Sequence, residues 1–278
     1  MTNPVQNRTK RLYGLQWNRY RIVRTVEDQA TLLLKTAMSP GEFAGKLVLD
    51  GGCGMGRYAR VAAGWGASVL GMDLSEAAIA AQDLTADHSS HVQILRGDLL
   101  RPPIAEGRFD LVYSIGVLDH TPDPRQAFLN LAKSVRPGGR MAIWVYQKQS
   151  PIVERIMAAH RAIARRLPVH FLERLSRLSV PVGGLKRRLM NSQFRLIERL
   201  GVALHALTIG VSMHPDPEVR ACDTLDWYAP RFVSHHTHEE VANWFAEAGF
   251  HDIADPTTGQ THFHQGQGQG VHMIGTKT

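Results

Sequence analysis

Short apolar runs and longer amphipathic stretches alternate along the first half of the chain. The apolar runs have the length of buried strands, and the first of them, "KLVLDG", ends in an Asp-Gly pair. The strands are expected at residues 46–51, 67–73, 92–98, 108–117 and 140–146, with helices over 57–66, 75–84 and 124–135 between them. Strands that alternate with helices at this spacing predict a parallel sheet covered by helices on both faces.

Local signals mark where several of these elements begin or end. Ser75 is a good N-cap for the second helix, and Pro137 with the two glycines after it is expected to stop the third. Farther along, "THEEVANWFAEAGF" (237–250) is typical of a helix, with Thr237 and Glu240 spaced as in a capping box. Two strands, "HDIADP" and "GVHMIGTK", are expected to follow it.

The alternation stops near residue 150, and residues 151–200 carry few strand signals. Leucine and isoleucine recur there at helical spacing in sets separated by Pro168, Pro181 and a Gly183-Gly184 pair. The sets are Ile152, Ile156, Ile163 and Leu167; Leu172, Leu175 and Leu178; and Leu185, Leu189, Leu196 and Leu200. The segment holds 11 Lys and Arg against 3 Asp and Glu, an excess of 8, whereas the whole chain carries +7. The surplus of basic residues therefore belongs to a helical insert, and the net charge of the rest of the chain is about −1.

The stretch "LVLDGGCGMGRYAR" (47–60) places a glycine-rich turn between the first strand and a helix. Glycine accepts positive φ and lets a ligand approach the backbone, and a helix N-terminus favours an anionic group. Residues 52–56 fit G-x-G-x-G, while residues 54–59 also fit the dinucleotide form G-x-G-x-x-A. Asp73 ends the second strand and would meet a pair of ribose hydroxyls in either case. The loop alone leaves nucleotide, dinucleotide and sulfonium cofactors open.

The third, fourth and fifth strands separate these choices. Asp98 ends the third strand, "FDLVYSIGV" forms the fourth, and "PGG" precedes the fifth. With the glycine loop and Asp73, this series resembles the class I S-adenosylmethionine-dependent methyltransferases of the small-molecule type. The resemblance covers residues 45–147 and extends weakly to the end of the chain.

The resemblance implies an α/β fold with a Rossmann-like, seven-stranded, mostly parallel sheet. Helices would cover both faces, the last strand would be antiparallel, and the basic helical insert would precede the last helix and strands. We therefore expect a single methyltransferase domain over residues 1–278. Its parts are an N-terminal helical cap (1–44), a cofactor-binding core (45–147), the helical insert (148–225), and a C-terminal helix with closing strands (226–278).

The resemblance also implies S-adenosylmethionine as the cofactor and gives roles to the strand ends. Asp50 would orient the glycine loop or meet the methionine amino group, and Asp73 would bind both ribose hydroxyls. Asp98 would accept from the adenine amino group, with the Leu99 backbone at the ring. Ile115 and the glycine after it would line the site beneath the methionine part. The expected binding residues are Asp50, Gly52, Gly54, Gly56, Asp73, Asp98, Leu99 and Ile115.

His120 is the candidate catalytic base. It lies in the loop after the fourth strand, where ligands gather at the carboxyl ends of parallel strands, and its ordinary pKa suits proton transfer near neutral pH. The alternative is that His120 only shapes the loop or contacts the cofactor. Asp119 is adjacent, but neighbouring residues seldom point to one target, so no His-Asp pair is implied. Candidates for an acceptor pocket are Trp144, Tyr146, His235 and His236.

The segment "YGLQW" (13–17) resembles one that precedes the loop in some small-molecule methyltransferases. Trp17 would either cover the cofactor as a lid or simply pack an N-terminal helix.

No metal site is expected, although histidines gather in "SHHTHEE" and "THFH". His238 is expected on the first turn of a helix, away from the neighbouring histidines, and the cysteines are distant in sequence. Cys53 is expected to be a small packed residue within the glycine loop. Cys53 and Cys222 are too few and too far apart for a disulfide framework.

The main functional hypothesis is methyl transfer from S-adenosylmethionine to a small-molecule or lipidic acceptor. One alternative is an NAD-dependent oxidoreductase, which Asp98 and the lack of an evident Tyr-x-x-x-Lys pair disfavour. The other is a non-catalytic S-adenosylmethionine-binding protein, because intact binding positions do not establish turnover. The pattern leaves open whether the acceptor atom is oxygen, nitrogen or carbon.

The basic insert has three interpretations: a lid over the acceptor pocket, a binder of an anionic acceptor, or a helical segment on a membrane surface. Nucleic acid is disfavoured as a partner, because the basic residues are interleaved with Leu and Ile and few aromatics are available for stacking. The polar N-terminal stretch and the lack of an apolar run of about 18 residues predict a cytoplasmic protein.

Overall fold

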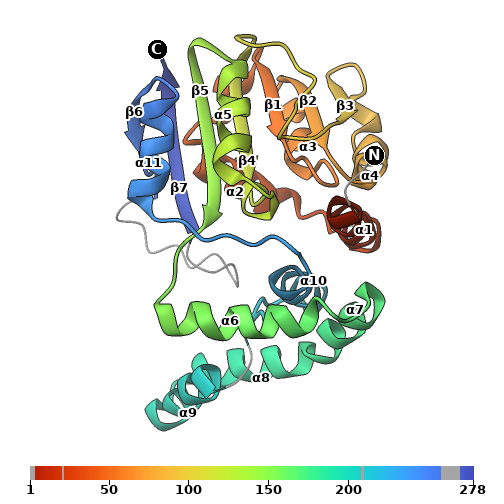
Figure 1. The fold of residues 1–278 in the computed structure, drawn as a ribbon, viewed down its shortest axis with the longest axis vertical. Coiled ribbons are helices and arrows are strands. Elements are labelled where there is room, and N and C mark those ends of the chain that lie inside the picture. Colours follow the sequence, from red (N-terminus) through yellow and green to blue (C-terminus); the bar gives the residue numbers. More distant parts are fainter. Residues whose placement is uncertain (1–3, 21, 208–209, 258–269) are drawn as a thin grey trace. The chain divides into compact units, whose positions relative to one another are not determined.

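A computed structural model of the chain describes residues 4–20, 22–207, 210–257 and 270–278 and divides them into two compact units (Figure 1). Unit 1 comprises the described residues within Met1–Gln149, Phe232–Thr261 and Gly270–Thr278, and unit 2 those within Ser150–Arg231. The expected end of the insert at residue 225 falls inside α10 (Pro217–Tyr228), so unit 2 ends later than the sequence suggests.

Unit 1 is built on one seven-stranded sheet with the order β3-β2-β1-β4-β5-β7-β6. The first five strands pair in parallel, and β7 runs antiparallel to both of its neighbours. The predicted fold class is therefore confirmed, including the antiparallel last strand. The strands are β1 (Leu47–Gly51), β2 (Ser68–Asp73), β3 (Val92–Arg96), β4 (Phe109–Ile115), β5 (Val135–Tyr146), β6 (Phe250–Ala254) and β7 (Gly270–Lys277).

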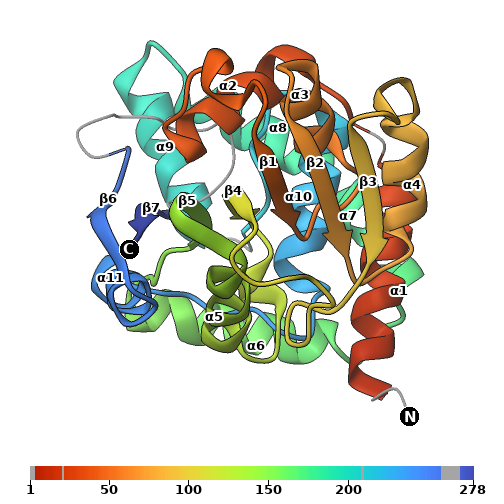
Figure 2. The ribbon, with the colours of Figure 1, turned by 90° about the horizontal axis from the view of Figure 1, so that it is seen from above.

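Helices cover both faces of this sheet because its strands are apolar on both sides. In Figure 2, α2 and α3 lie on one side of the sheet, and α5 and α11 lie on the other. Leu32, Phe43 and Tyr113 belong to the core on the first side, and Phe128 and Phe245 to the core on the second. The helices of unit 1 are α1 (Pro4–Arg19), α2 (Thr25–Thr36), α3 (Arg57–Gly64), α4 (Ala77–Leu84), α5 (Pro124–Ser134) and α11 (His238–Glu247), with 3-10 turns at Pro40–Phe43, Ala86–His88 and Leu118–His120.

Two predicted element ends in the core are corrected by the structure. Helix α4 begins at Ala77 rather than at Ser75, because the Ser75 hydroxyl and backbone N–H both donate to Asp73, which draws this residue into the turn after β2. Ser75 Oγ still accepts from the Ala77 N–H. The Pro-Gly-Gly segment at 137–139 does not form a separate stop, since β5 starts at Val135 and holds it as an irregularity between the pairs Phe109–Val135 and Leu111–Arg140.

The predicted capping box of α11 is half formed. Thr237 Oγ accepts from the Glu240 N–H at 3.1 Å, as expected for an N-cap. The Glu240 carboxylate instead contacts His236 Nδ1 at 3.0 Å, so it is not the reciprocal partner of the cap. Residues 262–269 of the "HFHQGQGQG" turn expected between the closing strands lie outside the described residues, and its last residue, Gly270, begins β7.

Unit 2 consists of helices α6 (Pro151–Ala164), α7 (Val169–Leu178), α8 (Val180–Met190), α9 (Arg195–Leu207) and α10. Contrary to the sequence interpretation, Gly183 and Gly184 lie inside α8 and do not interrupt it. A Cβ at Gly183 would approach the Ser212 carbonyl oxygen to 2.2 Å, so these glycines allow close packing. Arg220 fills the same place, donating to the carbonyls of Val180 and His214.

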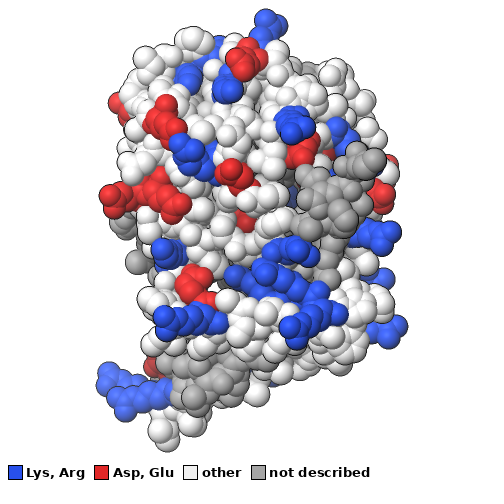
Figure 3. Space-filling view, in the orientation of Figure 1, with Lys and Arg blue, Asp and Glu red and all other residues white. Residues whose placement is uncertain are grey.

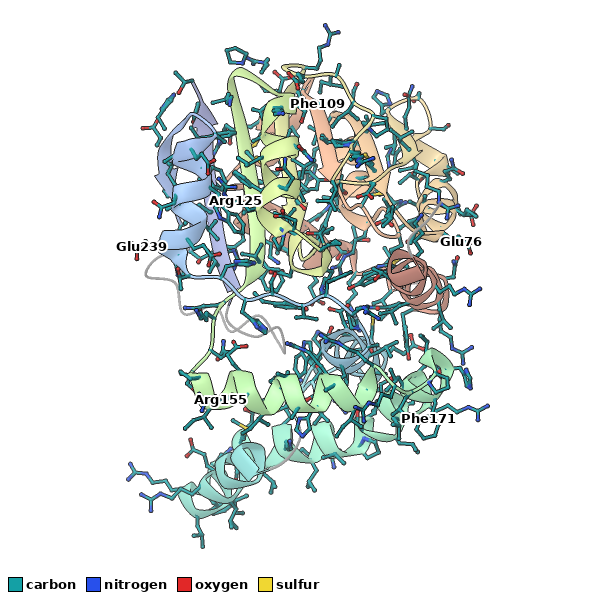
Figure 4. The ribbon with its side chains drawn as sticks, viewed as in Figure 1. Glu76, Phe109, Arg125, Arg155, Phe171 and Glu239 are labelled. Carbon is teal, nitrogen blue, oxygen red and sulfur yellow. The ribbon has the colours of Figure 1, made fainter. Side chains whose placement is uncertain are left out.

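The surface of unit 2 is both apolar and basic. The exposed large apolar residues are Ile152, Val153, Ile156, Ile163, Phe171, Leu175, Leu178, Val182, Leu185, Phe194, Leu196, Ile197 and Leu200. Lys and Arg gather over these helices on the face drawn in Figure 3. Figure 4 labels two of the exposed side chains, Arg155 on α6 and Phe171 on α7. None of the helices in the described ranges is long and apolar enough to cross a bilayer.

Candidate functional site

The glycine loop connects β1 to α3 at the carboxyl edge of the sheet. Gly52, Gly54 and Gly56 have φ of 89°, 54° and 83°, a region in which an L side chain is strained. A Cβ at Gly52 would approach Val117 Cγ1 to 2.3 Å, because the loop after β4 lies directly against the glycine loop. The loop conformation and its surroundings therefore both require glycine at this position.

Trp17 lies over this loop. A Cβ on Gly54 would be 3.3 Å from the Trp17 indole, and the Arg57 guanidinium lies 6.0 Å from the centre of that ring. Arg57 also pairs with the buried carboxylate of Asp28 at 3.4 Å, which ties α3 to α2. The Trp17 indole therefore lies beside the glycine loop, and its role as a lid stays a prediction.

Asp50 is a buried carboxylate beneath the loop. It is 2% exposed, and its Oδ2 accepts from the Tyr113 hydroxyl at 3.2 Å. Burial raises the pKa of Asp50 to about 7, and the nearby carboxylate of Asp73 adds to this rise. A cationic group arriving above Asp50 would favour its ionised form, as expected for a partner of an amino group.

Asp73 links the end of β2 to the glycine loop. Its Oδ2 accepts from the Gly54 N–H at 2.9 Å, and its Oδ1 accepts from the N–H and hydroxyl of Ser75. A carboxylate has about four lone-pair sites, so hydroxyl donors from a ligand can still be accepted. Asp73 therefore orders the loop as well as facing the edge where a ribose would lie.

The remaining predicted binding residues lie after β3 and at the end of β4. Asp98 Oδ1 accepts from the Leu100 N–H, and the Leu99 carbonyl accepts from the Asn130 side chain. These bonds hold the turn after β3 in place. Ile115 is the last residue of β4, beside β1 in the sheet.

His120 lies in a 3-10 turn after β4 and is 7% exposed. Its Nδ1 lies 3.2 Å from the Phe232 carbonyl oxygen. A carbonyl oxygen only accepts, so this contact places the proton on Nδ1 and leaves the lone pair of the neutral ring on Nε2. The second nitrogen is thus the one able to take a proton.

Aromatic rings surround His120. Its ring centre lies 5.5 Å from that of Tyr13 and 5.6 Å from that of Tyr146. The ring centre of Tyr146 also lies 5.8 Å from that of His235 and 5.3 Å from that of Trp144. Of the four side chains predicted for an acceptor pocket, Trp144, Tyr146 and His235 share this cluster.

The fourth, His236, belongs to a different group. Its Nδ1 contacts Glu240 at 3.0 Å, and its Nε2 contacts Ser234 Oγ at 2.9 Å. The Oδ1 atom of Asp119 lies 4.0 Å from His236 Nε2. Both carboxylate oxygens of Asp119 accept from the Tyr146 N–H at 3.1 Å. Asp119 thus accepts from the Tyr146 N–H, whereas the His120 ring bonds to the Phe232 carbonyl.

Comparison with known proteins identifies the core of unit 1. A family model described as "Methyltransferase domain" matches residues 49–143, from β1 to β5. The chain carries a class I, S-adenosylmethionine-dependent methyltransferase domain. The matched segment contains the glycine loop, Asp73, Asp98 and His120, and the predicted cofactor is the methyl donor of this class.

Two of the curated relatives that match part of this chain are O-methyltransferases by name. A probable chloroplastic tocopherol O-methyltransferase of Oryza sativa subsp. japonica is 31% identical over 154 residues, which is 52% of this chain and 41% of that protein. A ubiquinone biosynthesis O-methyltransferase of Pseudomonas paraeruginosa is 33% identical over 128 residues, or 45% of this chain and 55% of that protein. The chain thus spans about half the length of the curated relatives it matches.

A solved methyltransferase structure has a similar fold. The magnesium protoporphyrin IX methyltransferase from Synechocystis PCC 6803, with bound SAH, is 16% identical, and the match covers 100% of this chain and 89% of that one. Its TM-score of 0.52 supports the arrangement of the sheet and helices.

Several residues of unit 1 that border the candidate site were not found by sequence reasoning. Tyr113 bonds to Asp50, Val117 packs on Gly52, and Tyr13 lies on His120. Lys35 is buried above Trp144. Each meets its partner across a long separation in the chain, where no local pattern signals the contact.

Within the described ranges, no group of three or more His, Cys, Asp and Glu side chains is placed to hold a metal ion. His238 begins α11 and contacts Asp255 at 2.9 Å, while His262 and His264 lie outside the described residues. Cys53 and Cys222 are both buried thiols, and burial raises the pKa of Cys53 well above its ordinary value. Cys53 is accordingly a packed thiol rather than a reactive one.

Proposed function

We propose that this protein transfers a methyl group from S-adenosylmethionine to a hydroxyl oxygen of a small-molecule acceptor. The observation that carries the proposal is the loop after β4, which packs on the glycine loop through Val117 and also carries His120. Val117 packs on Gly52, and His120, three residues later, has its tautomer set by the Phe232 carbonyl. The names of both relatives, which are O-methyltransferases, favour oxygen as the acceptor atom.

The residues at the glycine loop fit the donor. Glycines with positive φ leave room where a Cβ would clash, and the buried carboxylate of Asp50 suits an amino group. Asp73 would hold the ribose hydroxyls, Asp98 the adenine amino group, and Ile115 the underside of the methionine part. When bound, S-adenosylmethionine supplies a methyl carbon that already carries a good leaving group.

The chain's own residues then position the acceptor and move one proton. The acceptor hydroxyl would give its proton to Nε2 of His120 as its oxygen takes the methyl group, which the bound donor would supply with sulfur as the leaving group. The Nδ1–H bond to Phe232 holds the imidazole in place throughout. Positioning and exclusion of water supply much of the rate in such a displacement, and a base adds about 10²–10⁴-fold.

Calorimetric titration with S-adenosylhomocysteine and with NAD tests the donor half of this proposal. Wild-type protein should bind S-adenosylhomocysteine in the micromolar range and NAD not at all. Asp73→Asn removes the carboxylate charge while keeping an oxygen for the Gly54 N–H, so it should weaken binding about tenfold without unfolding the chain. Binding of NAD alone would make the protein an oxidoreductase candidate.

A His120→Gln variant tests the catalytic half. It should bind S-adenosylhomocysteine as wild type does and lose about 10²–10⁴-fold in turnover of a hydroxylated acceptor. Equal turnover would remove His120 from the chemistry. A wild-type protein that binds donor but transfers no methyl group to any hydroxyl acceptor would favour the non-catalytic alternative.

We further propose that unit 2 contacts an anionic membrane surface. On α7, Phe171, Leu175 and Leu178 lie at helical spacing and are all exposed, and the interleaved Arg174 and Arg177 are exposed as well. Apolar side chains among basic ones suit insertion at the boundary between acidic headgroups and acyl chains. The cytoplasmic location stays a prediction.

Vesicle sedimentation tests this surface. Wild-type protein should bind vesicles of phosphatidylcholine with phosphatidylserine more strongly than vesicles of phosphatidylcholine alone, and less strongly at high salt. Replacing Phe171, Leu175 and Leu178 by serine should abolish binding, whereas Ile79→Ser on α4 of unit 1 should not. Concentration-dependent self-association in place of vesicle binding would assign the surface to a second copy of the chain.

A further inference from the structure

A lysine is buried within unit 1, and the structure places no counter-ion beside it among the residues that it describes. Lys35 lies near the end of α2 and is 2% exposed. Its Nζ lies 4.0 Å from the centre of the Trp144 ring. Among the described residues, no carboxylate or hydrogen-bond acceptor bonds to this ammonium group. Lysine is almost never fully buried without a partner, so the position calls for a physical reason.

The ring beneath Lys35 borders the proposed active site. A Cβ on Gly116 would be 3.3 Å from Trp144, and the Gly116 N–H donates to the Trp144 carbonyl. Trp144 contacts Tyr146, which contacts His120. Lys35 is thus linked to the proposed base through two aromatic rings.

The sheet order places Lys35 on the acceptor side. The residues proposed for the donor lie at the carboxyl ends of β1, β2 and β4 or in the turns after β1 and β3. Trp144 is on β5, which lies beyond β4 in the order β3-β2-β1-β4-β5, and its other neighbour is His272 on β7. A group held above Trp144 is therefore displaced away from the glycine loop.

An unpaired ammonium is unfavourable in this place. The attraction of the Trp144 ring compensates only part of the lost hydration. Burial accordingly lowers the pKa of Lys35 well below its ordinary value, and the positive charge of Arg57 adds to the effect. An incoming anion would supply the missing counter-charge and restore the charged form of the lysine.

We propose that Lys35 is the recognition group for a carboxylate on the methyl acceptor, bound above Trp144. The inference rests on the proposed methyltransferase function and narrows its acceptor to hydroxylated carboxylic acids. The rings of Trp144, Tyr146 and Tyr13 would contact the planar part of such an acid.

The test compares an acid with its neutral amide. Wild-type protein saturated with S-adenosylhomocysteine is titrated with 3,4-dihydroxybenzoate and with 3,4-dihydroxybenzamide, and methyl transfer to both is measured with S-adenosylmethionine. We expect at least a tenfold preference for the acid. Lys35→Met, of similar length and without charge, should remove the preference, and Lys35→Arg should retain part of it. Lys133→Met, on the exposed face of α5, is the matched control and should behave as wild type.

Several results would overturn the proposal. One is a wild-type protein that does not distinguish the acid from the amide, including one that binds neither, and another is an unchanged preference in Lys35→Met. A third is selective loss of S-adenosylhomocysteine affinity in Lys35→Met, with binding of 5′-methylthioadenosine intact, because the lysine would then serve the donor carboxylate. Failure of the wild type to bind S-adenosylhomocysteine would instead remove the proposed function itself. Thermal unfolding and circular dichroism show whether each variant folds, and Lys35→Met should be at least as stable as wild type because it removes a buried charge.

Discussion

The two units of this chain place their large apolar side chains in opposite ways. Within the described parts of unit 1, the exposed large apolar residues are Val23, Val26, Leu47 and Ile79, and both faces of the sheet are covered. In the part of unit 2 whose side chains are described, thirteen such residues are exposed, and they run from Ile152 to Leu200. On α7, two polar residues, Glu173 and Ser176, are buried beside Leu172, whereas the aromatic ring of Phe171 is exposed. Unit 1 is therefore stabilised by its own burial, whereas the surface of unit 2 suits an apolar or lipidic neighbour.

A pair of phenylalanines should show the largest contrast between the units. Phe128 is fully buried and packs against Phe245 with ring centres 4.8 Å apart, so Phe128→Ala should cost about 3–5 kcal/mol of stability. Phe171→Ala in unit 2 removes an exposed ring and should change stability by less than about 0.5 kcal/mol. Urea unfolding of both variants measures the difference. Equal losses would mean that the apolar surface of unit 2 is covered in solution.

The buried carboxylate of unit 1 should give stability a pH dependence. Because burial raises the pKa of Asp50 to about 7, the folded state binds this proton more tightly than the unfolded state does. Stability should therefore fall as pH rises from about 4 to about 7 and stay lower above that range. Asp50→Asn should remove this part of the dependence and stabilise the empty protein at pH 8 by up to about 4 kcal/mol, the value of a three-unit shift.

Thermal unfolding of wild type and Asp50→Asn between pH 5 and pH 8 checks this expectation. Other carboxylates titrate in both proteins, so only the difference between the two curves reports Asp50. The same difference at every pH would contradict the assignment. The effect on donor binding should be opposite to the effect on stability, because Asp50→Asn should bind S-adenosylhomocysteine less tightly than wild type.

Two glycines test whether donor binding belongs to unit 1 alone. Gly52→Ala places a Cβ at 2.3 Å from Val117 at a φ of 89°, so it should cost about 2 kcal/mol or more and abolish donor binding. Gly183→Ala in α8 meets the Ser212 carbonyl and should loosen unit 2 while leaving donor affinity unchanged. Gly41→Ala, with open space around it, is the control. Calorimetry with S-adenosylhomocysteine on the three variants measures donor affinity. Loss of binding in Gly183→Ala would contradict the assignment of donor binding to unit 1 alone.

The smallest effect is expected at the surface of unit 1. Arg125 on α5 and Glu247 on α11 form an exposed ion pair, and Figure 4 labels Arg125. Arg125→Ala should cost about 0.2–1 kcal/mol, and the loss should shrink at high salt. A double-mutant cycle with Glu247→Ala isolates the pair. A coupling that does not depend on salt would indicate packing rather than charge.

Most of the sheet could be predicted from the sequence, because each strand is an apolar run bounded by turn residues. The predicted ends of helices were wrong where a contact with another part of the fold outweighed the local sequence signal. Ser75 is drawn to Asp73 and does not begin α4, and Gly183 continues α8 because Arg220 and Ser212 pack on it. The sets of Ile and Leu in the insert were correctly recognised as helical, but periodicity does not reveal that Ile152 and Leu178 face outward.

The candidate site divides in the same way. Asp73 and the glycines were accessible to sequence reasoning because parallel strands deliver their carboxyl ends to one edge. Lys35 and Tyr13 were not, since helices α1 and α2 precede the sheet and their contacts depend on how they pack over it. The tautomer of His120 depends on the Phe232 carbonyl, which follows the whole of unit 2 in the chain.

The sheet topology has a consequence for synthesis on the ribosome. Strand β7 lies between β5 and β6, although it follows both in the chain. While a nascent chain emerges, β5 keeps an unpaired edge, and β6 has no strand to join, until residues of β7 leave the exit tunnel. Unit 2 is translated during that interval. The exposed backbone of β5 is therefore the place where a nascent or prematurely terminated chain would be most prone to edge-to-edge aggregation, and where a chaperone would act.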